Sequence, residues 1–290
     1  MRSLILRPLF TLMLAISALA LLKLCVDGFT RREFEQAHQF PVALFGDSHG
    51  NDVPVKQVPR FNRPAQDLVS TWMRMRELAD LKGPDSKVEV VVLTIWPMKF
   101  GPVTERRMSG RVQADGWHRS VLGEASPMLR WGDLFRSEWP WRLRWQLLLN
   151  GAQLERVRSL MGWVCRDGDL PDGYVAPVSD RMVHEHWFEG SRMSTWAFEA
   201  MVDLARESGW QLLILEHPMH PSFFENANSA SLDDYRNLMQ SAAALSHVHY
   251  LGLGWDVLPN SAFIDFHHLS CEGMEYVGAR LDPLLEELRD

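Results

Sequence analysis

The segment 88–95 constrains the fold of this chain more than any other. It reads VEVVVLTI, so apolar and mostly β-branched residues fill almost every position. A strand with one face in water alternates apolar and polar residues, whereas an unbroken apolar run is typical of a strand covered on both faces. Such strands occur in parallel sheets with helices on both sides. The segment therefore predicts an α/β domain with a mostly parallel sheet.

Strand and helix patterns alternate along much of the remaining chain. Further strand candidates are 40–45, 210–215 and 249–253, and helix candidates are 66–81, 195–208 after the cap Ser194, 231–245 with Ser231 as cap, and 272–288 with a bend or break at Pro283. In open parallel sheets, ligands bind beyond the carboxyl ends of the strands. We therefore expect functional residues in the loops that follow strands.

The N-terminal residues 1–27 differ in kind from the rest. Arg2 and Arg7 precede the uncharged apolar run 8–22, which is the pattern of an export signal. Apolar residues also follow the possible cleavage site 18–20, which favours an uncleaved signal anchor over a removed signal peptide. We expect a single-pass protein of the cytoplasmic membrane with its catalytic domain on the periplasmic side.

Residues 28–39 form a polar linker or short helix, and 40–290 form one domain with an insertion at about 101–190 that is rich in Gly, Pro, Arg and Trp. An amphipathic helix is plausible within the insertion at 143–160. Four tryptophans alternate with arginines there, namely Trp131, Trp139, Trp141 and Trp145. These rings could stack on sugars or rest on a membrane interface, or simply pack inward.

Net charge and cysteine content restrict the partners and the compartment. The net charge of -7 leaves no basic surplus to neutralise phosphates, which argues against nucleic acid as a partner. Of the 3 cysteines, Cys25 falls in the anchor. Cys165 and Cys271 could pair in an oxidising compartment, but the sequence favours two unpaired, small apolar side chains.

Two short motifs at opposite ends of the domain carry the chemistry. Ser48 follows the first strand candidate between small and turn-forming residues, while Asp265 and His268 lie in the loop before the last helix. A serine hydroxyl needs a base to become a nucleophile, and a carboxylate orients that base. His267 competes for the base role, but the three-residue step from Asp265 favours His268. The backbone amide of Ser48 could supply part of an oxyanion hole.

Other histidines allow weaker interpretations. Residues 184–186 (His-Glu-His) and 216–220 (Glu-His-Pro-Met-His) contain metal-ligand types, but no motif fixes a coordination geometry. We therefore expect neither a metal nor a cofactor. His49 follows the serine and could line the pocket, although a structural role is favoured.

These motifs resemble those of the SGNH hydrolase superfamily, also called GDSL esterases. The resemblance rests on Gly46-Asp47-Ser48, on Asp265-x-x-His268, and on His268-Leu269-Ser270 followed by Gly273. It implies a three-layer, flavodoxin-like fold and a Ser48–His268–Asp265 triad. The superfamily also carries an oxyanion Asn after its second main strand, where this chain has no Asn at 94–99. Asn62 is a candidate donor by position.

The anchor and layout look most like the cell-envelope branch of that superfamily, which includes proteins of alginate acetylation and teichoic-acid D-alanylation. This implies an acyl donor, an envelope polysaccharide as acceptor, and membrane-protein partners. The first hypothesis is therefore serine-dependent O-acyl or O-acetyl transfer to such a polysaccharide. A plain ester hydrolase acting on small esters or lipids, and a non-catalytic partner in an envelope assembly, remain as alternatives.

Overall fold

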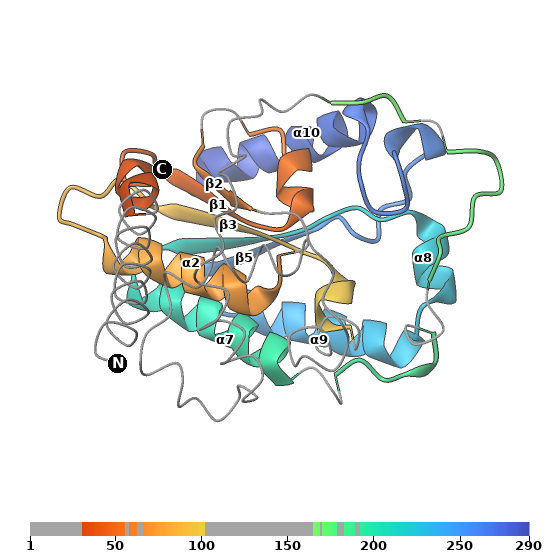
Figure 1. The fold of residues 1–290 in the computed structure, drawn as a ribbon, viewed down its shortest axis with the longest axis horizontal. Helices are drawn as coiled ribbons and strands as arrows, with labels where there is room; N and C mark the ends of the chain where they lie inside the picture. Colours follow the sequence, from red (N-terminus) through yellow and green to blue (C-terminus); the bar gives the residue numbers. More distant parts are fainter. Residues whose placement is uncertain are drawn as a thin grey trace, which may run out of the picture.

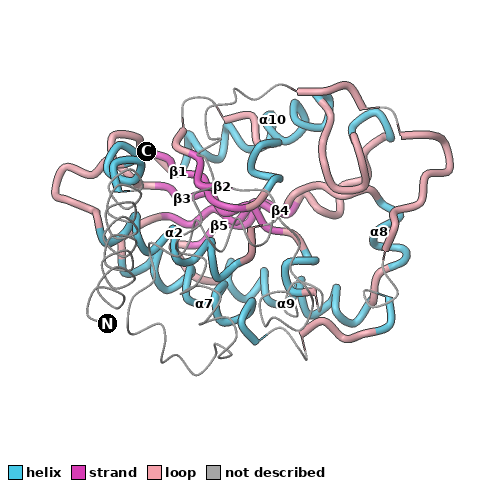
Figure 2. Tube along the Cα trace, viewed as in Figure 1, coloured by secondary structure: helices cyan, strands magenta, loops and turns pink. Residues whose placement is uncertain are grey.

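A five-stranded parallel sheet forms the centre of the computed structural model, which describes residues 31–55, 58–62, 66–101, 165–168, 170–178, 183–188 and 192–289. The strands are β1 (Val42–Gly46), β2 (Arg60–Asn62), β3 (Val90–Ile95), β4 (Gln211–Glu216) and β5 (Val248–Gly252). All neighbouring pairs run parallel, in the order β2-β1-β3-β4-β5 (Figures 1 and 2). This is the strand order of flavodoxin-like folds. The predicted α/β class and parallel sheet are confirmed.

Helices cover both faces of the sheet. The labelled helices of the described residues are α2 (Leu68–Asp80), α7 (Arg192–Glu207), α8 (Pro221–Asn226), α9 (Ser229–Ala243) and α10 (Cys271–Glu287), together with the short 3-10 helices η1 (Ser48–Asp52), η2 (Pro97–Phe100) and η5 (Asn260–Ala262). Figure 1 shows α10 on one side of the sheet and α2, α7 and α9 on the other. The molecule therefore has three layers.

Alternating strand residues supply two cores, one on each face of the sheet. Towards α2, α7 and α9, β3 buries Val91, Leu93 and Ile95, whereas towards α10 it buries Val90 and Val92. All six residues of β3 are buried. This explains the unbroken apolar run, because both faces of a central parallel strand are covered.

The segment expected to be a linker or short helix contributes to one of these cores. Residues 31–37 are helical, and the ring of Phe34 is fully buried and stacks on Phe61 of β2 with centroids 4.4 Å apart. This part of the segment therefore belongs to the domain.

Several predicted element boundaries are wrong. α9 begins at Ser229, because Asn228 caps it, and the hydroxyl of the expected cap Ser231 instead accepts from the backbone N–H of Trp187. α7 begins at Arg192, before the expected cap Ser194. α10 spans Cys271–Glu287, within one residue of the predicted range at each end, and is not broken at Pro283. The sequence interpretation also missed β2, whose three residues are too few to show a period.

Cys165 and Cys271 form a disulfide, with Cα atoms 5.0 Å apart, so the expectation of two unpaired thiols is wrong. The two cysteines are 106 residues apart in sequence, and only the fold brings them together. The bond joins a residue within the predicted insertion (101–190) to the first residue of α10.

Parts of the earlier predictions lie outside the described residues. These are the anchor at 1–27, the helix at 143–160 and the four tryptophans between 131 and 145. Within the described ranges, none of the helices combines the length and apolar character needed to cross a bilayer.

Candidate functional site

Ser48 begins the 3-10 helix η1, which follows the carboxyl end of β1. The turn between them depends on Gly46, whose φ of +149° is rarely adopted by residues with a side chain. A Cβ at Gly46 would lie 1.8 Å from Oγ1 of Thr94 on β3, so the close approach of the two strands also requires glycine. Ser48 is half-buried at this edge of the sheet.

The loop between η5 and α10 carries the other two predicted residues and is closed on itself. Phe263 and Leu269 form an antiparallel bridge, and the N–H of Ile264 donates to the carbonyl of His268 at 2.8 Å. Within this base loop (263–269), Oδ1 of Asp265 accepts from the backbone N–H groups of His267 and His268, at 2.9 and 2.8 Å. The carboxylate is therefore fixed in orientation before it meets any imidazole.

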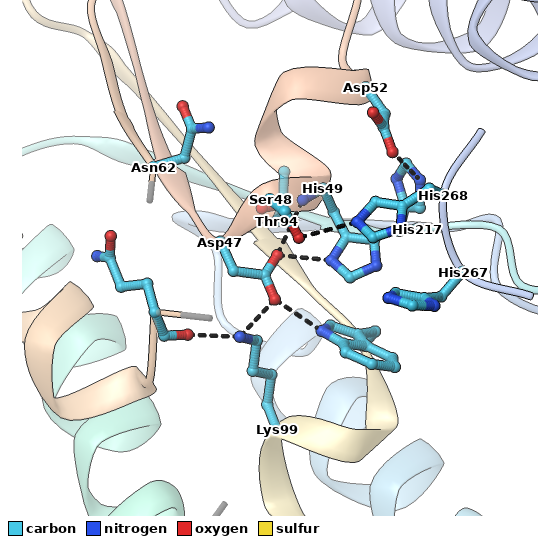
Figure 3. A network of polar contacts seen from close by, with 12 residues as sticks. Asp47, Ser48, His49, Asp52, Asn62, Thr94, Lys99, His217, His267 and His268 are labelled. Carbon is cyan, nitrogen blue, oxygen red and sulfur yellow. Dashed lines mark hydrogen bonds and ion pairs between the residues drawn. The ribbon is translucent and has the colours of Figure 1, made fainter. Parts of the chain in front are cut away.

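The structure brings Ser48, His268 and Asp265 together, in contact across 220 residues of sequence (Figure 3). Nε2 of His268 lies 3.1 Å from Oγ of Ser48, and Nδ1 lies 2.8 Å from Oδ2 of Asp265. With Nδ1–H donated to the carboxylate, Nε2 carries a lone pair towards the hydroxyl. This is the arrangement that lets an imidazole take a proton from serine.

Electrostatics favour proton transfer to His268. Burial alone would lower the pKa of His268, but its hydrogen bond to Asp265 and the negative charges of Asp265, Asp52 and Asp47 raise that pKa above its usual value. Burial likewise opposes ionisation of Asp265, yet its bonds to His267 and His268 hold its pKa well below the usual range. An imidazolium at His268 would thus face a permanent carboxylate.

Asp47 precedes the serine and is held in a separate, buried network. Its Oδ1 lies 2.6 Å from Nδ1 of His49, and its Oδ2 accepts from Nε1 of Trp96 at 2.9 Å and pairs with the ammonium of Lys99 (Figure 3). Lys99 also donates to the carbonyl of Gln66. Burial would raise the pKa of Asp47, but His49 and Lys99 outweigh it and keep that pKa well below its usual range.

Sequence reasoning noted only that 94–99 lacks the expected Asn. In the structure, Trp96 and Lys99 of that segment instead hold the carboxylate of Asp47, which precedes Ser48. No sequence pattern signalled this role.

His49 has a structural place in this network, as expected. Its side chain is 1% exposed, and burial lowers its pKa to about 4 against the opposing effect of Asp47. It is therefore neutral at pH 7. Its ring stacks on that of His268, with centroids 5.3 Å apart and planes 12° from parallel. The ring of His49 thus supports one face of the base.

Three imidazoles gather closely enough to raise the question of a metal. One nitrogen from each of His49, His267 and His268 lies within 4.8 Å of the others. However, both ring nitrogens of His268 already have hydrogen-bond partners: Nε2 contacts Ser48 and Nδ1 contacts Asp265. The rings of His49 and His268 are also almost parallel, so their in-plane lone pairs do not converge on one point. The arrangement suits proton transfer better than coordination.

His267, the competing base, faces elsewhere. Its ring is stacked on Trp96, with centroids 5.2 Å apart and planes 8° from parallel. Its Nδ1 lies 2.9 Å from Oδ1 of Asp265, at ion-pair distance but without hydrogen-bond alignment. His268 is therefore the imidazole that meets Ser48.

The other metal-ligand candidates are separated from one another. His220 caps α8 and bonds Ser222 and Asn260, at 2.7 and 3.0 Å. His186 pairs with Asp234 at 3.2 Å. His217 is fully buried, and its Nε2 lies 3.5 Å from Oδ2 of Asp52. None of these pairs forms a cluster of three ligands among the described residues.

Asn62, the candidate oxyanion donor, ends β2 and pairs in register with Gly46. It is 6% exposed, and its Nδ2 donates to Oδ1 of Asn51 at 2.8 Å. In Figure 3, Asn62 and His268 lie on opposite sides of Ser48. An oxyanion donor belongs on the side of the nucleophile away from the base, but the amide of Asn62 is already engaged with Asn51.

The geometry defines a serine–histidine–aspartate site at the carboxyl edge of a flavodoxin-like sheet. No family model matches the chain, and no curated protein sequence is significantly similar to it.

Proposed function

We propose that this protein is an SGNH-type enzyme that transfers acyl groups through an acyl-serine intermediate on Ser48. The observation that carries the proposal is the unbroken contact from Ser48 through His268 to Asp265, at 3.1 and 2.8 Å. The agreement of strand order, early serine and late Asp-x-x-His with the superfamily pattern adds support.

In the first half-reaction, Oγ of Ser48 attacks the acyl carbonyl carbon while its proton passes to Nε2 of His268. Asp265 stabilises the imidazolium. The tetrahedral intermediate collapses, the bond to the leaving alcohol breaks, and that alcohol takes the proton from His268. In the second half-reaction an acceptor hydroxyl gives its proton to His268 and attacks the acyl-serine, and Ser48 regains its proton.

The developing oxyanion needs donors, each worth about 3 kcal/mol of barrier in comparable sites. The backbone N–H of Ser48 is the first in η1 and so has no partner within that helix. We assign it as one donor. Asn62 is the second candidate, and it serves only if its amide leaves Asn51 when substrate binds.

We further propose that the acceptor is a cell-envelope polysaccharide and that the domain lies on the periplasmic side of the cytoplasmic membrane. The disulfide between Cys165 and Cys271 supports an oxidising compartment, since such bonds rarely persist in the cytosol. The apolar run at 8–22 supports attachment to the membrane.

Ester hydrolysis is the second candidate. The side chains of His268 and Asp265 are 29% and 41% exposed, so water can reach the base in the free enzyme. Water would then replace the sugar hydroxyl in the second half-reaction. The two candidates differ only in the acceptor and share every step up to the acyl-serine.

A two-stage experiment tests the proposal. The folded protein is first treated with a fluorophosphonate, and the labelled residue is identified by mass spectrometry; labelling of Ser48 is expected. Failure to label would favour a non-catalytic partner with this fold. An activated acetyl ester is then supplied with and without envelope saccharides. Acetylated saccharide supports transfer, whereas rapid hydrolysis unaffected by saccharide supports an esterase.

A further inference from the structure

Asp52 is a buried carboxylate that neither the sequence analysis nor the proposed mechanism uses. It ends η1, the 3-10 helix that Ser48 begins, and is 7% exposed. Its Oδ2 accepts from the backbone N–H of Leu269 at 3.2 Å. Leu269 directly follows His268. The carboxylate therefore bridges the turn that carries the nucleophile and the base loop, two segments 217 residues apart in sequence.

We propose that Asp52 is a positioning residue, which holds the base loop against the nucleophile turn and adds a second carboxylate charge beside His268. The inference rests on the proposed function, because it concerns the same serine and histidine. Asp265 orients the imidazole from within its own loop, whereas Asp52 fixes that loop relative to Ser48.

The surroundings of Asp52 show why its charge reaches the base. The base loop contributes Asp265 and His267 to the environment of His268, and the nucleophile turn contributes Asp47, His49 and Asp52. His217, which follows β4, faces Asp52 itself, with Nε2 3.5 Å from Oδ2. Asp47 is matched by the ammonium of Lys99. Figure 3 places Asp52 and Lys99 on opposite sides of the imidazoles. The ammonium of Lys99 thus partly cancels the effect of the Asp47 charge on His268.

Arg60 of β2 is a cation that interacts with Asp52. Its guanidinium donates to the carbonyls of Gly50, Val53 and Val55, and the charge of Asp52 stabilises it. Arg60 therefore fastens the backbone around Asp52. The negative charge of Asp52 is one of the causes that raise the pKa of His268.

Two substitutions separate position from charge. Asp52→Asn keeps a carbonyl oxygen for the N–H of Leu269 but removes the charge, whereas Asp52→Ala removes both. The readout is the rate of Ser48 labelling by a fluorophosphonate between pH 5 and 9, which needs no knowledge of the substrate. Asp203→Asn, on the exposed face of α7, is the control that loses the same charge far from the site.

We expect Asp52→Asn to label at the wild-type rate at high pH, with the midpoint of its pH profile lower by about half a pH unit. Asp52→Ala should show the same shift of the midpoint and, at high pH, should also label about tenfold more slowly than wild type, because the base loop is no longer held. The control should match wild type in both respects.

An unshifted midpoint in Asp52→Asn would overturn the role of the charge, and a wild-type rate in folded Asp52→Ala would overturn the role in positioning. Circular dichroism establishes the folded state of each variant. Failure of wild-type Ser48 to label at all would instead count against the proposed function, so the two failures are distinguishable.

Discussion

Single residues next to Ser48 set its position more than its own side chain does. Gly46 permits the turn out of β1, and Asp47 is tied to Trp96 and Lys99, so the chain that leads into the serine is fixed. Among the residues that the structure describes, the hydroxyl has one side-chain hydrogen-bond partner, His268. Removal of that hydroxyl should therefore affect chemistry and leave packing nearly unchanged.

Ser48→Ala tests this expectation. Turnover of an activated ester should fall by at least about a thousandfold, since loss of a nucleophile removes the acyl-enzyme route. Stability should stay within about 0.5 kcal/mol of wild type in urea unfolding. Ser246→Ala, an exposed position after α9, is the control for a generic Ser-to-Ala effect. Near-normal turnover in Ser48→Ala would refute the nucleophile assignment.

The pH dependence of the wild type follows from the raised pKa of His268. The base must be neutral to accept the proton of Ser48, so activity is present above its pKa and is lost as the pH falls through it. Because that pKa lies above the usual value of about 6.5, the acidic limb should have its midpoint above about pH 6.5. Initial rates from pH 5 to 9 measure it. A midpoint below pH 6 would contradict the assignment.

At this scale the sequence predicted the three residues of the proposed triad but not those that hold them in place. Ser48, Asp265 and His268 were identifiable because their types and order match one mechanism. Asp52, Trp96 and Lys99 were missed, since a carboxylate, an indole and an ammonium in loops are common and become informative only when the fold juxtaposes them. The preference for His268 over His267 followed from the spacing, and the geometry agrees.

Elements were predictable in proportion to their length and periodicity. β3 stood out because both of its faces are buried, whereas β2 could not be seen in three residues. The starts of α7 and α9 were misplaced because serines suggested caps, while in α9 the neighbouring Asn228 takes that role. Which residue caps a helix depends on its tertiary partners. The hydroxyl of Ser231 accepts a hydrogen bond from the backbone N–H of Trp187, which lies outside the helix.

The disulfide links two elements that the chain alone does not bring together. Cys165→Ser with Cys271→Ser should lower the free energy of unfolding by about 2–4 kcal/mol, because a loop of 106 residues is no longer closed in the unfolded state. Urea unfolding measures the change. Cys25→Ser, which leaves the pair intact, should unfold as wild type does. Equal midpoints for the double variant and wild type would show that the bond does not form.

For the molecule as a whole, a buried carboxylate at the end of β4 links stability to pH. Glu216 is fully buried and accepts a hydrogen bond from the hydroxyl of Tyr250. Burial raises the pKa of Glu216 to about 7, although the bond from Tyr250 opposes this. The folded state therefore holds a proton that the unfolded state releases near pH 4.5. Its contribution to stability is complete below that pH and is lost as the pH rises through about 7.

Glu216→Gln keeps an acceptor for Tyr250 without the charge. The variant should match wild type near pH 4.5 and exceed its free energy of unfolding at pH 8, by at most about 3 kcal/mol. Urea unfolding at the two pH values provides the comparison. Glu207→Gln, on the exposed surface of α7, should show no such divergence. A variant that is less stable than wild type at pH 8 would contradict this account.

The predicted insertion (101–190) is attached to the edge of the sheet that carries Ser48 at its first residue and again at Cys165. Gly101 directly follows η2, which holds Asp47, and Cys165 is fastened to the start of α10 just after the base loop. Because one of these two attachments is a disulfide, a reducing environment would release the chain directly beside the base loop.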